Sequence, residues 1–220
     1  QRFPQVSESM MEAVDKADSA QFSHDEILNP TDWVLLNYLM DARTGLGRFR
    51  QFTISNYQLM MKLIDACRTL SISEILQLPD VVERVELYKE HENKAIDQIR
   101  RCAVEHDNVI VLDLRNEEVI HPTNRFMVYA LYPDCNVSIH VMWGLRQQNT
   151  VFAIGKSITN RSSQRNVGEI CLQHGGGGHM AAGTCQVEND WASRIELELV
   201  TALQDATVTS DDNASEQSIH

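Results

Sequence analysis

The sequence predicts an α/β protein in which a helical N-terminal segment and a long connecting helix lead into a compact domain built on a mixed sheet. Up to about residue 105, apolar side chains recur at helical spacing, whereas later runs are short, rich in β-branched and aromatic residues, and alternate with period two. We therefore expect a helical part over residues 1–78, the connecting helix over 79–105, an α/β domain over 106–206 and a disordered acidic tail over 207–220.

The N-terminal part is expected to consist of four helices. Apolar side chains at helical spacing predict a first helix over residues 7–18, and Ser23 is a good N-cap for a short second one. A third, over residues 29–40, is apolar nearly all round and should be buried. Residues 56–70 resume a helical pattern after a glycine-containing loop.

The connecting helix has the clearest pattern. Pro79 suits a first-turn position, and one apolar stripe runs from there to Ala103. At 1.5 Å per residue such a helix spans roughly 40 Å. Beyond it, the change of period predicts strands over residues 109–114, 126–132, 137–143, 150–154 and 181–187, and helices over 166–174 and 190–206.

Composition excludes several classes of protein. The 220 residues include 43% apolar ones, enough for a buried core, but their mean hydropathy is −0.30 and no apolar run approaches the roughly 20 residues of a membrane helix. No signal peptide is recognisable. Five scattered cysteines without a C-x-x-C pair favour neither a disulfide framework nor a zinc site, so a cytoplasmic protein is expected.

Charge is distributed unevenly along the chain. The 19 basic and 31 acidic residues give a net charge of −12, which alone argues against an anionic partner. Residues 135–168, however, hold no carboxylate. This window contains four basic residues, Arg146, Lys156, Arg161 and Arg165, and a second acid-free window, residues 42–64, contains Arg43, Arg48, Arg50 and Lys62. Each window alone is explained equally well by chance clustering and by a basic surface.

The sharpest motif is GGGGHMAAG at residues 175–183. Consecutive glycines expose backbone N–H groups that can bind phosphate oxygens, and His179 adds a side-chain donor. The alternatives are a flexible linker, or a structural histidine without ligand contact. Gly155-Lys156-Ser157 does not complete a P-loop, because Thr150 stands where that motif needs glycine.

Residues 166–170 (NVGEI), followed by the 175–183 motif, closely resemble the signature of the DHH-associated domain, the C-terminal domain of DHH-family phosphoesterases. The likeness covers about residues 109–206. This family includes nanoRNases, phosphodiesterases acting on cyclic dinucleotides and short oligonucleotides, and exopolyphosphatase-related proteins. The resemblance implies that the substrate's phosphate or terminal nucleotide is contacted by Gly176, Gly177, Gly178 and His179.

The resemblance also implies a second group of substrate contacts. A Ser/Arg segment on the strand before the signature helix binds substrate in the family, and either Lys156-Ser157 or Arg161-Ser162 could occupy that place here. Arg165 is a further candidate for a neighbouring phosphate. Because these residues share one acid-free window, a basic binding surface is favoured over chance.

The family's metal-binding machinery is largely missing. No Asp-His-His triplet occurs in the chain. Residues 14–22 resemble the family's last metal motif, which implies Asp18 as a single metal ligand, with Asp15 as second choice. A solvent-facing acid at a helix end explains Asp18 equally well. We expect manganese or magnesium in the intact enzyme and no metal bound by this chain alone.

The sequence therefore predicts the C-terminal, substrate-binding portion of a metal-dependent phosphoesterase. Residues 1–78 would be a remnant of, or a linker from, an upstream catalytic domain. Short oligonucleotides, nucleotide phosphates and polyphosphate are the expected substrates, read without sequence preference. The chain alone is expected to be inactive. A non-catalytic nucleic-acid or nucleotide-binding module is the alternative, followed by a purely structural dimerisation domain; the resemblance also implies a possible homodimer.

Overall fold

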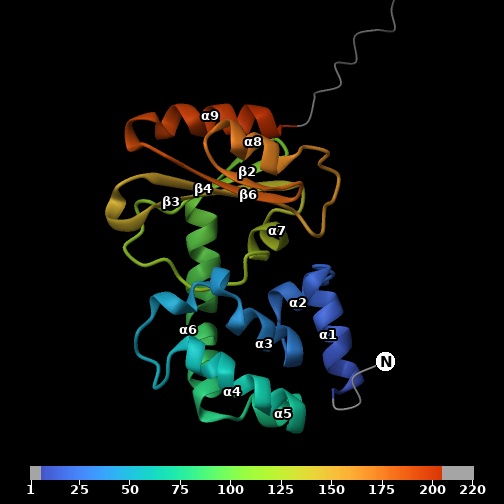
Figure 1. The fold of residues 1–220 in the computed structure, drawn as a ribbon. Coiled ribbons are helices and arrows are strands. Elements are labelled where there is room, and N and C mark those ends of the chain that lie inside the picture. Colours follow the sequence, from blue (N-terminus) through green and yellow to red (C-terminus); the bar gives the residue numbers. More distant parts are fainter. Residues whose placement is uncertain (1–5, 205–220) are drawn as a thin grey trace, which may run out of the picture.

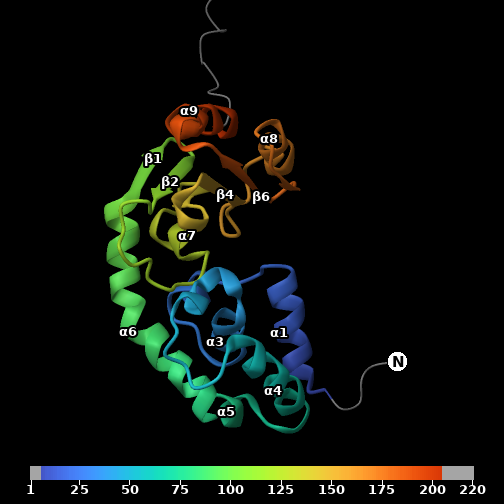
Figure 2. The same ribbon diagram turned by 60° about the vertical axis from the view of Figure 1, so that its left-hand side comes forward.

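The structure is a computed structural model that describes residues 6–204. A long helix, α6 (Pro79–Cys102), runs from a cluster of helices to a sheet (Figures 1 and 2). The helices that precede it are α1 (Glu8–Asp18), α2 (His24–Leu28), α3 (Asp32–Met40), α4 (Asn56–Thr69) and α5 (Ile72–Ile75). The predicted α/β fold with N-terminal helices is confirmed. The expected tail, residues 207–220, lies outside the described residues.

Serine caps explain where several N-terminal helices begin. Ser23, Ser55 and Ser71 each form a capping box, in which the serine hydroxyl accepts a hydrogen bond from the backbone of the third helical residue, whose side chain accepts one from the serine N–H. Helix α3 is buried as expected, because its apolar residues pack against α4, α5 and the first half of α6. These helices thus share one core.

Helix α6 ends three residues earlier than predicted. Ala103–His106 form strand β1, which pairs antiparallel with β2 (Val109–Asp113) through a two-residue turn. The apolar stripe of the helix continues to Ala103. The four residues of β1 are too few for the spacing of their apolar side chains to distinguish a strand from a last helical turn. Pairing with β2 decides in favour of a strand.

The sheet is mixed, as predicted, and has six strands in the order β1-β2-β3-β4-β6-β5. The remaining strands are β3 (Val137–Trp143), β4 (Thr150–Lys156), β5 (Gly177–His179) and β6 (Ala182–Val187). Only β2 and β3 run parallel, and β5 lies at an edge.

Both faces of the sheet are covered. Val109 and Val111 of β2 face the core beneath α8 (Val167–Gln173) and α9 (Ala192–Leu203), whereas Ile110 and Leu112 face α6 and α7 (Met127–Leu131). A strand buried on both sides explains why residues 109–112 are uniformly apolar. The core on the α6 side also includes Phe22, Ile27 and Tyr38, which joins the N-terminal helices to the sheet.

The predicted strand over residues 126–132 is wrong, because this segment forms helix α7. Apolar and aromatic side chains that are buried on all sides suit a helix as well as a strand. The topology requires the helix, since the parallel strands β2 and β3 must be joined by a crossover. Tyr129 anchors it, because its hydroxyl donates to the Gly155 carbonyl at 2.7 Å.

The last helix is shorter than the predicted 190–206. Residues 189–191 form a 3₁₀ turn, and α9 occupies Ala192–Leu203. Within residues 6–204 no helix combines the length and the apolar character needed to cross a membrane.

Candidate phosphate-binding site

The glycine run begins as the C-terminal cap of α8. Gly175 adopts a φ of +74°, and its N–H donates to the Leu172 carbonyl at 3.1 Å, while the N–H of Gly176 donates to the Cys171 carbonyl at 2.9 Å. This pair of bonds is the Schellman motif, which satisfies the last carbonyls of a helix. The run is therefore not one open turn, and the N–H groups of its first two glycines are already bonded.

Close backbone packing explains why residues 176 and 178 are glycines. A Cβ on Gly176 would overlap the Thr184 carbonyl oxygen, and one on Gly178 would overlap the Ala182 carbonyl oxygen. Gly168 in α8 is constrained in the same way, because its Cβ would lie 2.8 Å from the Gly178 carbonyl oxygen. These glycines bring α8, β5 and β6 into direct backbone contact.

Gly177 is different. It is exposed, its φ is not positive, and a Cβ built on it would meet no atom within 4 Å. Neither backbone conformation nor packing requires glycine there. The space beside this edge strand is open, and alternate backbone groups of an edge strand face away from its partner.

His179 ends β5 and is exposed. Its Nδ1 atom lies 3.2 Å from the Ala181 backbone nitrogen, which donates to it. An accepting Nδ1 carries no proton, so in the neutral ring the proton is on Nε2. The backbone thereby fixes a tautomer whose Nε2–H can donate to a ligand.

Lys156 lies at the same end of the sheet as His179. Gly155 and His179 both pair with Ala182, from β4 and β5 on the two sides of β6. The Lys156 N–H donates to the Ala181 carbonyl at 2.9 Å, and its ammonium group donates to the Ser163 carbonyl at 3.1 Å. The backbone of Lys156 thus contacts the turn that follows His179, and its ammonium group contacts the loop that leads to α8.

The other candidates of the acid-free window hold loops in place. The Ser157 hydroxyl is buried and accepts from the Asn160 N–H at 3.0 Å. Arg161 donates to the Ala20 carbonyl at 3.1 Å, across to the N-terminal helices, and Arg165 donates to the Gln204 carbonyl at 3.1 Å. Among residues 6–204 neither guanidinium group forms an ion pair. Ser157 shapes the backbone of its loop.

Two of the four cations in the second acid-free window are ion-paired. Arg43 pairs with Asp41 at 2.7 Å, and Lys62 pairs with Asp80 at 2.5 Å. Asp41 immediately precedes the window, whereas Asp80 comes from the first turn of α6.

Asp18 lies exposed at the end of α1 and lines a pocket of about 370 Å³. The other residues lining it include Phe22, Asn37, Asp41, Arg43, Arg125 and Phe126. Within residues 6–204 no three His, Cys, Asp or Glu side chains gather closely enough to hold a metal ion. Asp18 and the ion-paired Asp41 therefore do not complete a metal centre in the described part of the chain.

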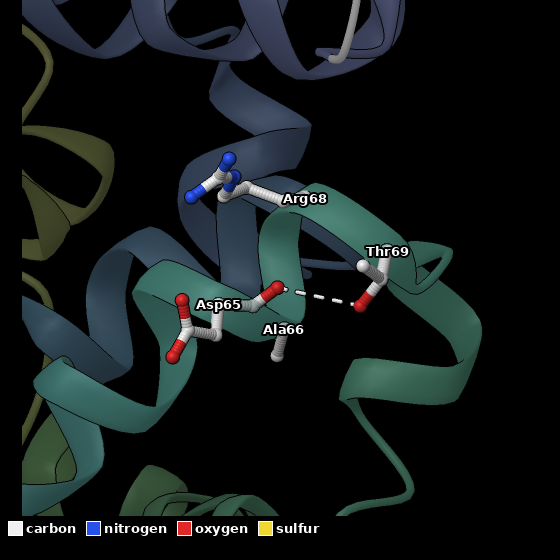
Figure 3. A pocket seen from close by; sticks show the side chains of 4 residues that line it. All are labelled: Asp65, Ala66, Arg68 and Thr69. Carbon is white, nitrogen blue, oxygen red and sulfur yellow. Dashed lines mark hydrogen bonds between the residues drawn. The ribbon is translucent and has the colours of Figure 1, made fainter.

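A second hollow, of about 670 Å³, lies at the C-terminal end of α4 (Figure 3). It is lined by four residues of that one helix, Asp65, Ala66, Arg68 and Thr69. Thr69 donates to the Asp65 carbonyl at 3.3 Å, and the polar side chains do not converge on one point. This hollow has no arrangement that would orient a ligand.

Sequence reasoning missed Arg125 and Phe126 as pocket residues. Phe126 was assigned to a strand, and Arg125 lies outside both acid-free windows. The one signal that could have predicted a helix at these residues is that two parallel strands need a crossover connection between them.

The chain is similar to the pGpG-specific phosphodiesterase PggH from Vibrio cholerae, with 60% identity over 89% of this chain and a TM-score of 0.81. It spans 65% of the length of that protein. CDC45 from Entamoeba histolytica shares the fold alone, at 6% identity over 79% of this chain and 38% of its own, with a TM-score of 0.50. An exopolyphosphatase-related protein from Bacteroides fragilis is 12% identical over 90% of this chain and 57% of its own, with a TM-score of 0.41. No protein-family model and no curated protein matches the chain significantly.

The chain thus combines a mixed sheet and a glycine-rich edge strand ending in a histidine with 60% identity to a phosphodiesterase. This similarity supports the resemblance of residues 166–170 and 175–183 to the DHH-associated domain.

Proposed function

We propose that this chain binds a short linear dinucleotide of the pGpG type as the substrate-holding part of a phosphodiesterase. The observation that carries the proposal is Gly177, an exposed glycine that neither φ nor packing requires and that leaves open space beside His179. The 60% identity to a pGpG-specific phosphodiesterase supports a dinucleotide over polyphosphate, and an enzyme over a free-standing binding module.

Each residue has a distinct task in this proposal. The Nε2–H of His179, oriented through its Nδ1 contact with Ala181, donates to a phosphate oxygen. Lys156 supplies positive charge from β4, on the other side of β6, and Gly177 lets the ligand approach the edge strand. Such contacts position a phosphate without reading base sequence. Bond cleavage would need groups that residues 6–204 do not gather, so this chain is assigned binding and placement.

The first test is His179→Ala with pGpG as ligand, measured by isothermal titration calorimetry. Loss of one hydrogen bond to a charged phosphate should cost about 1.5–3 kcal/mol, roughly a 10- to 150-fold weaker affinity. Met180→Ala is the matched control, because Met180 is the exposed neighbour of His179 and carries no polar group. Equal affinities of the His179→Ala variant and the unchanged chain would contradict the proposal.

The second test is hydrolysis. The purified 220 residues, incubated with pGpG and Mn²⁺, are expected to leave the dinucleotide intact, as separated by ion-exchange chromatography. Release of GMP in proportion to protein concentration would show that the chain itself cleaves its ligand and that the assignment of binding alone is wrong.

A further inference from the structure

The pocket that Asp18 lines contains an arginine without an obvious structural task. Arg125 precedes α7, and its Cζ atom lies 4.4 Å from the centre of the Phe126 ring, so stacking holds the guanidinium in place. Its Nε atom is buried and has no hydrogen-bond partner among residues 6–204. A buried donor left unpaired is costly, and natural proteins retain few of them.

Within residues 6–204 no carboxylate forms an ion pair with Arg125, although the charge of Asp41 acts on it from a distance and raises its pKa against the effect of burial. The Asp41 carboxylate accepts from Arg43 Nε at 2.7 Å and 3.1 Å and from the Arg43 backbone N–H at 2.9 Å, so its charge is already paired. The Asp18 side chain is exposed to solvent. Arg125 is partly buried, and this burial lowers the pKa of its guanidinium group. The guanidinium is thus a partly desolvated cation that lacks a bonded anion.

The pocket adjoins the segment that leads from Lys156 to α8. Arg161, five residues after Lys156, donates to the Ala20 carbonyl at 3.1 Å, between the pocket residues Asp18 and Phe22 in sequence. This hydrogen bond ties the segment to the turn between α1 and α2, which two of the residues lining the pocket, Asp18 and Phe22, flank. Its volume of about 370 Å³ falls within the range of small-molecule sites.

We propose that Arg125 binds a phosphate oxygen of the substrate other than the one that His179 contacts. The inference rests on the proposed function, because it assigns the second phosphate of a dinucleotide to this pocket. A guanidinium presents a planar fork that suits two oxygens of one phosphate, and such a contact would satisfy the unpaired Nε. Arg125 is thus a substrate-binding residue of the helical side.

The test compares Arg125→Met and Arg125→Lys with the unchanged 220-residue chain in pGpG titrations at several salt concentrations. Arg125→Met should bind roughly 10- to 100-fold more weakly. Its affinity should also fall less steeply with salt, because one screened charge–charge contact is lost. Arg125→Lys should recover part of the affinity, because it keeps the charge and loses the fork.

Arg194→Met is the matched control, since Arg194 also stacks on a neighbouring aromatic ring, Trp191, but lies on the exposed face of α9. It should leave affinity and salt slope unchanged. The thermal midpoint of Arg125→Met should be equal to or above that of the unchanged chain, because the variant removes an unpaired cation. A lower midpoint, or an affinity within twofold and an unaltered slope, would overturn the inference. If the unchanged chain fails to bind pGpG, the proposed function itself fails.

Discussion

Replacing Gly176 by alanine should destabilise the fold, whereas the same change at the next residue, Gly177→Ala, should leave the fold intact and weaken ligand binding. A methyl group on Gly176 would overlap the Thr184 carbonyl oxygen and lie 2.7 Å from the Cys185 Cα atom. Both neighbours are backbone atoms of β6 and cannot rotate away. Overpacking of this kind costs about 1–3 kcal/mol, and displacement of the Gly176 N–H from the Cys171 carbonyl would add to it.

Gly177→Ala places its methyl group where no atom lies within 4 Å, on a backbone that alanine can adopt. The free energy of unfolding should therefore stay the same or rise by up to about 1 kcal/mol, because alanine restricts the unfolded chain. The methyl group would occupy the space assigned to the ligand. We expect at least about tenfold weaker pGpG binding, equivalent to about 1.4 kcal/mol.

Urea unfolding and pGpG titration of both variants separate the two roles. Gly176→Ala should shift the unfolding midpoint downward, and Gly177→Ala should change only the binding isotherm. Full affinity in a well-folded Gly177→Ala variant would show that the open space at the edge strand is not where the ligand lies.

The structure also shows how far these roles could be predicted from the sequence. The motif at residues 175–183 drew attention to the glycine-rich segment and its histidine, because four consecutive glycines are unusual inside a domain. It could not divide the glycines by role. Gly175 and Gly176 complete a helix cap, while Gly177 is open, and this division depends on backbone contacts with β6 that have no local signature.

Long-range contacts explain the other differences. Local capping signals placed the start of α2 well, since Ser23 and Glu26 interact within one turn. The segment 126–132 became a helix through its burial between sheet and N-terminal helices, which a seven-residue apolar pattern does not reveal. The sequence also did not reveal that Arg125 lines a pocket, because α1, α3 and α7 come together there only in the folded chain.

Mild acid should destabilise this protein through its histidines. Burial lowers the pKa of His140, on the central strand β3, to about 4. Burial also lowers the pKa of His91 and of His121, whose Nδ1 atoms lie 2.8 Å apart and share one hydrogen bond. A bond between two Nδ1 atoms needs one bare nitrogen, so protonation of both rings breaks it.

The charged groups around the His91–His121 pair shift the pKa values of its two rings in both directions. Lys94 lowers the pKa of both rings, whereas Glu90 raises that of His91 and Glu117 raises that of His121; Arg101 lowers that of His121. The net direction is downward for each histidine. Phe49 packs edge-on against His91 at 5.0 Å between ring centres, so the pair also joins the N-terminal helices to the loop that holds His121.

The sign of the pH dependence follows from proton binding. Below the unfolded-state pKa of about 6.5, an unfolded histidine takes up a proton that the folded one rejects, so the free energy of unfolding falls as pH falls. For His140 the loss runs from about pH 6.5 down to about pH 4, at about 1.4 kcal/mol per pH unit where one full proton separates the two states. Above pH 7 the histidine contribution is fully present.

Urea unfolding of the unchanged chain and of His140→Gln at pH 7.5, 6.5, 5.5 and 4.5 measures this effect. His140→Gln should have the flatter dependence of unfolding free energy on pH, since glutamine cannot take up the proton in either state. Ile139→Val, on the same strand, is the control: its cavity should cost about 0.5–1.5 kcal/mol at every pH and leave the slope unaltered. Parallel curves for His140→Gln and the unchanged chain would mean that His140 titrates alike in the folded and unfolded states. The acid sensitivity would then belong to the His91–His121 pair. His91→Gln tests that pair in the same series, because it removes one ring of the pair and leaves β3 untouched.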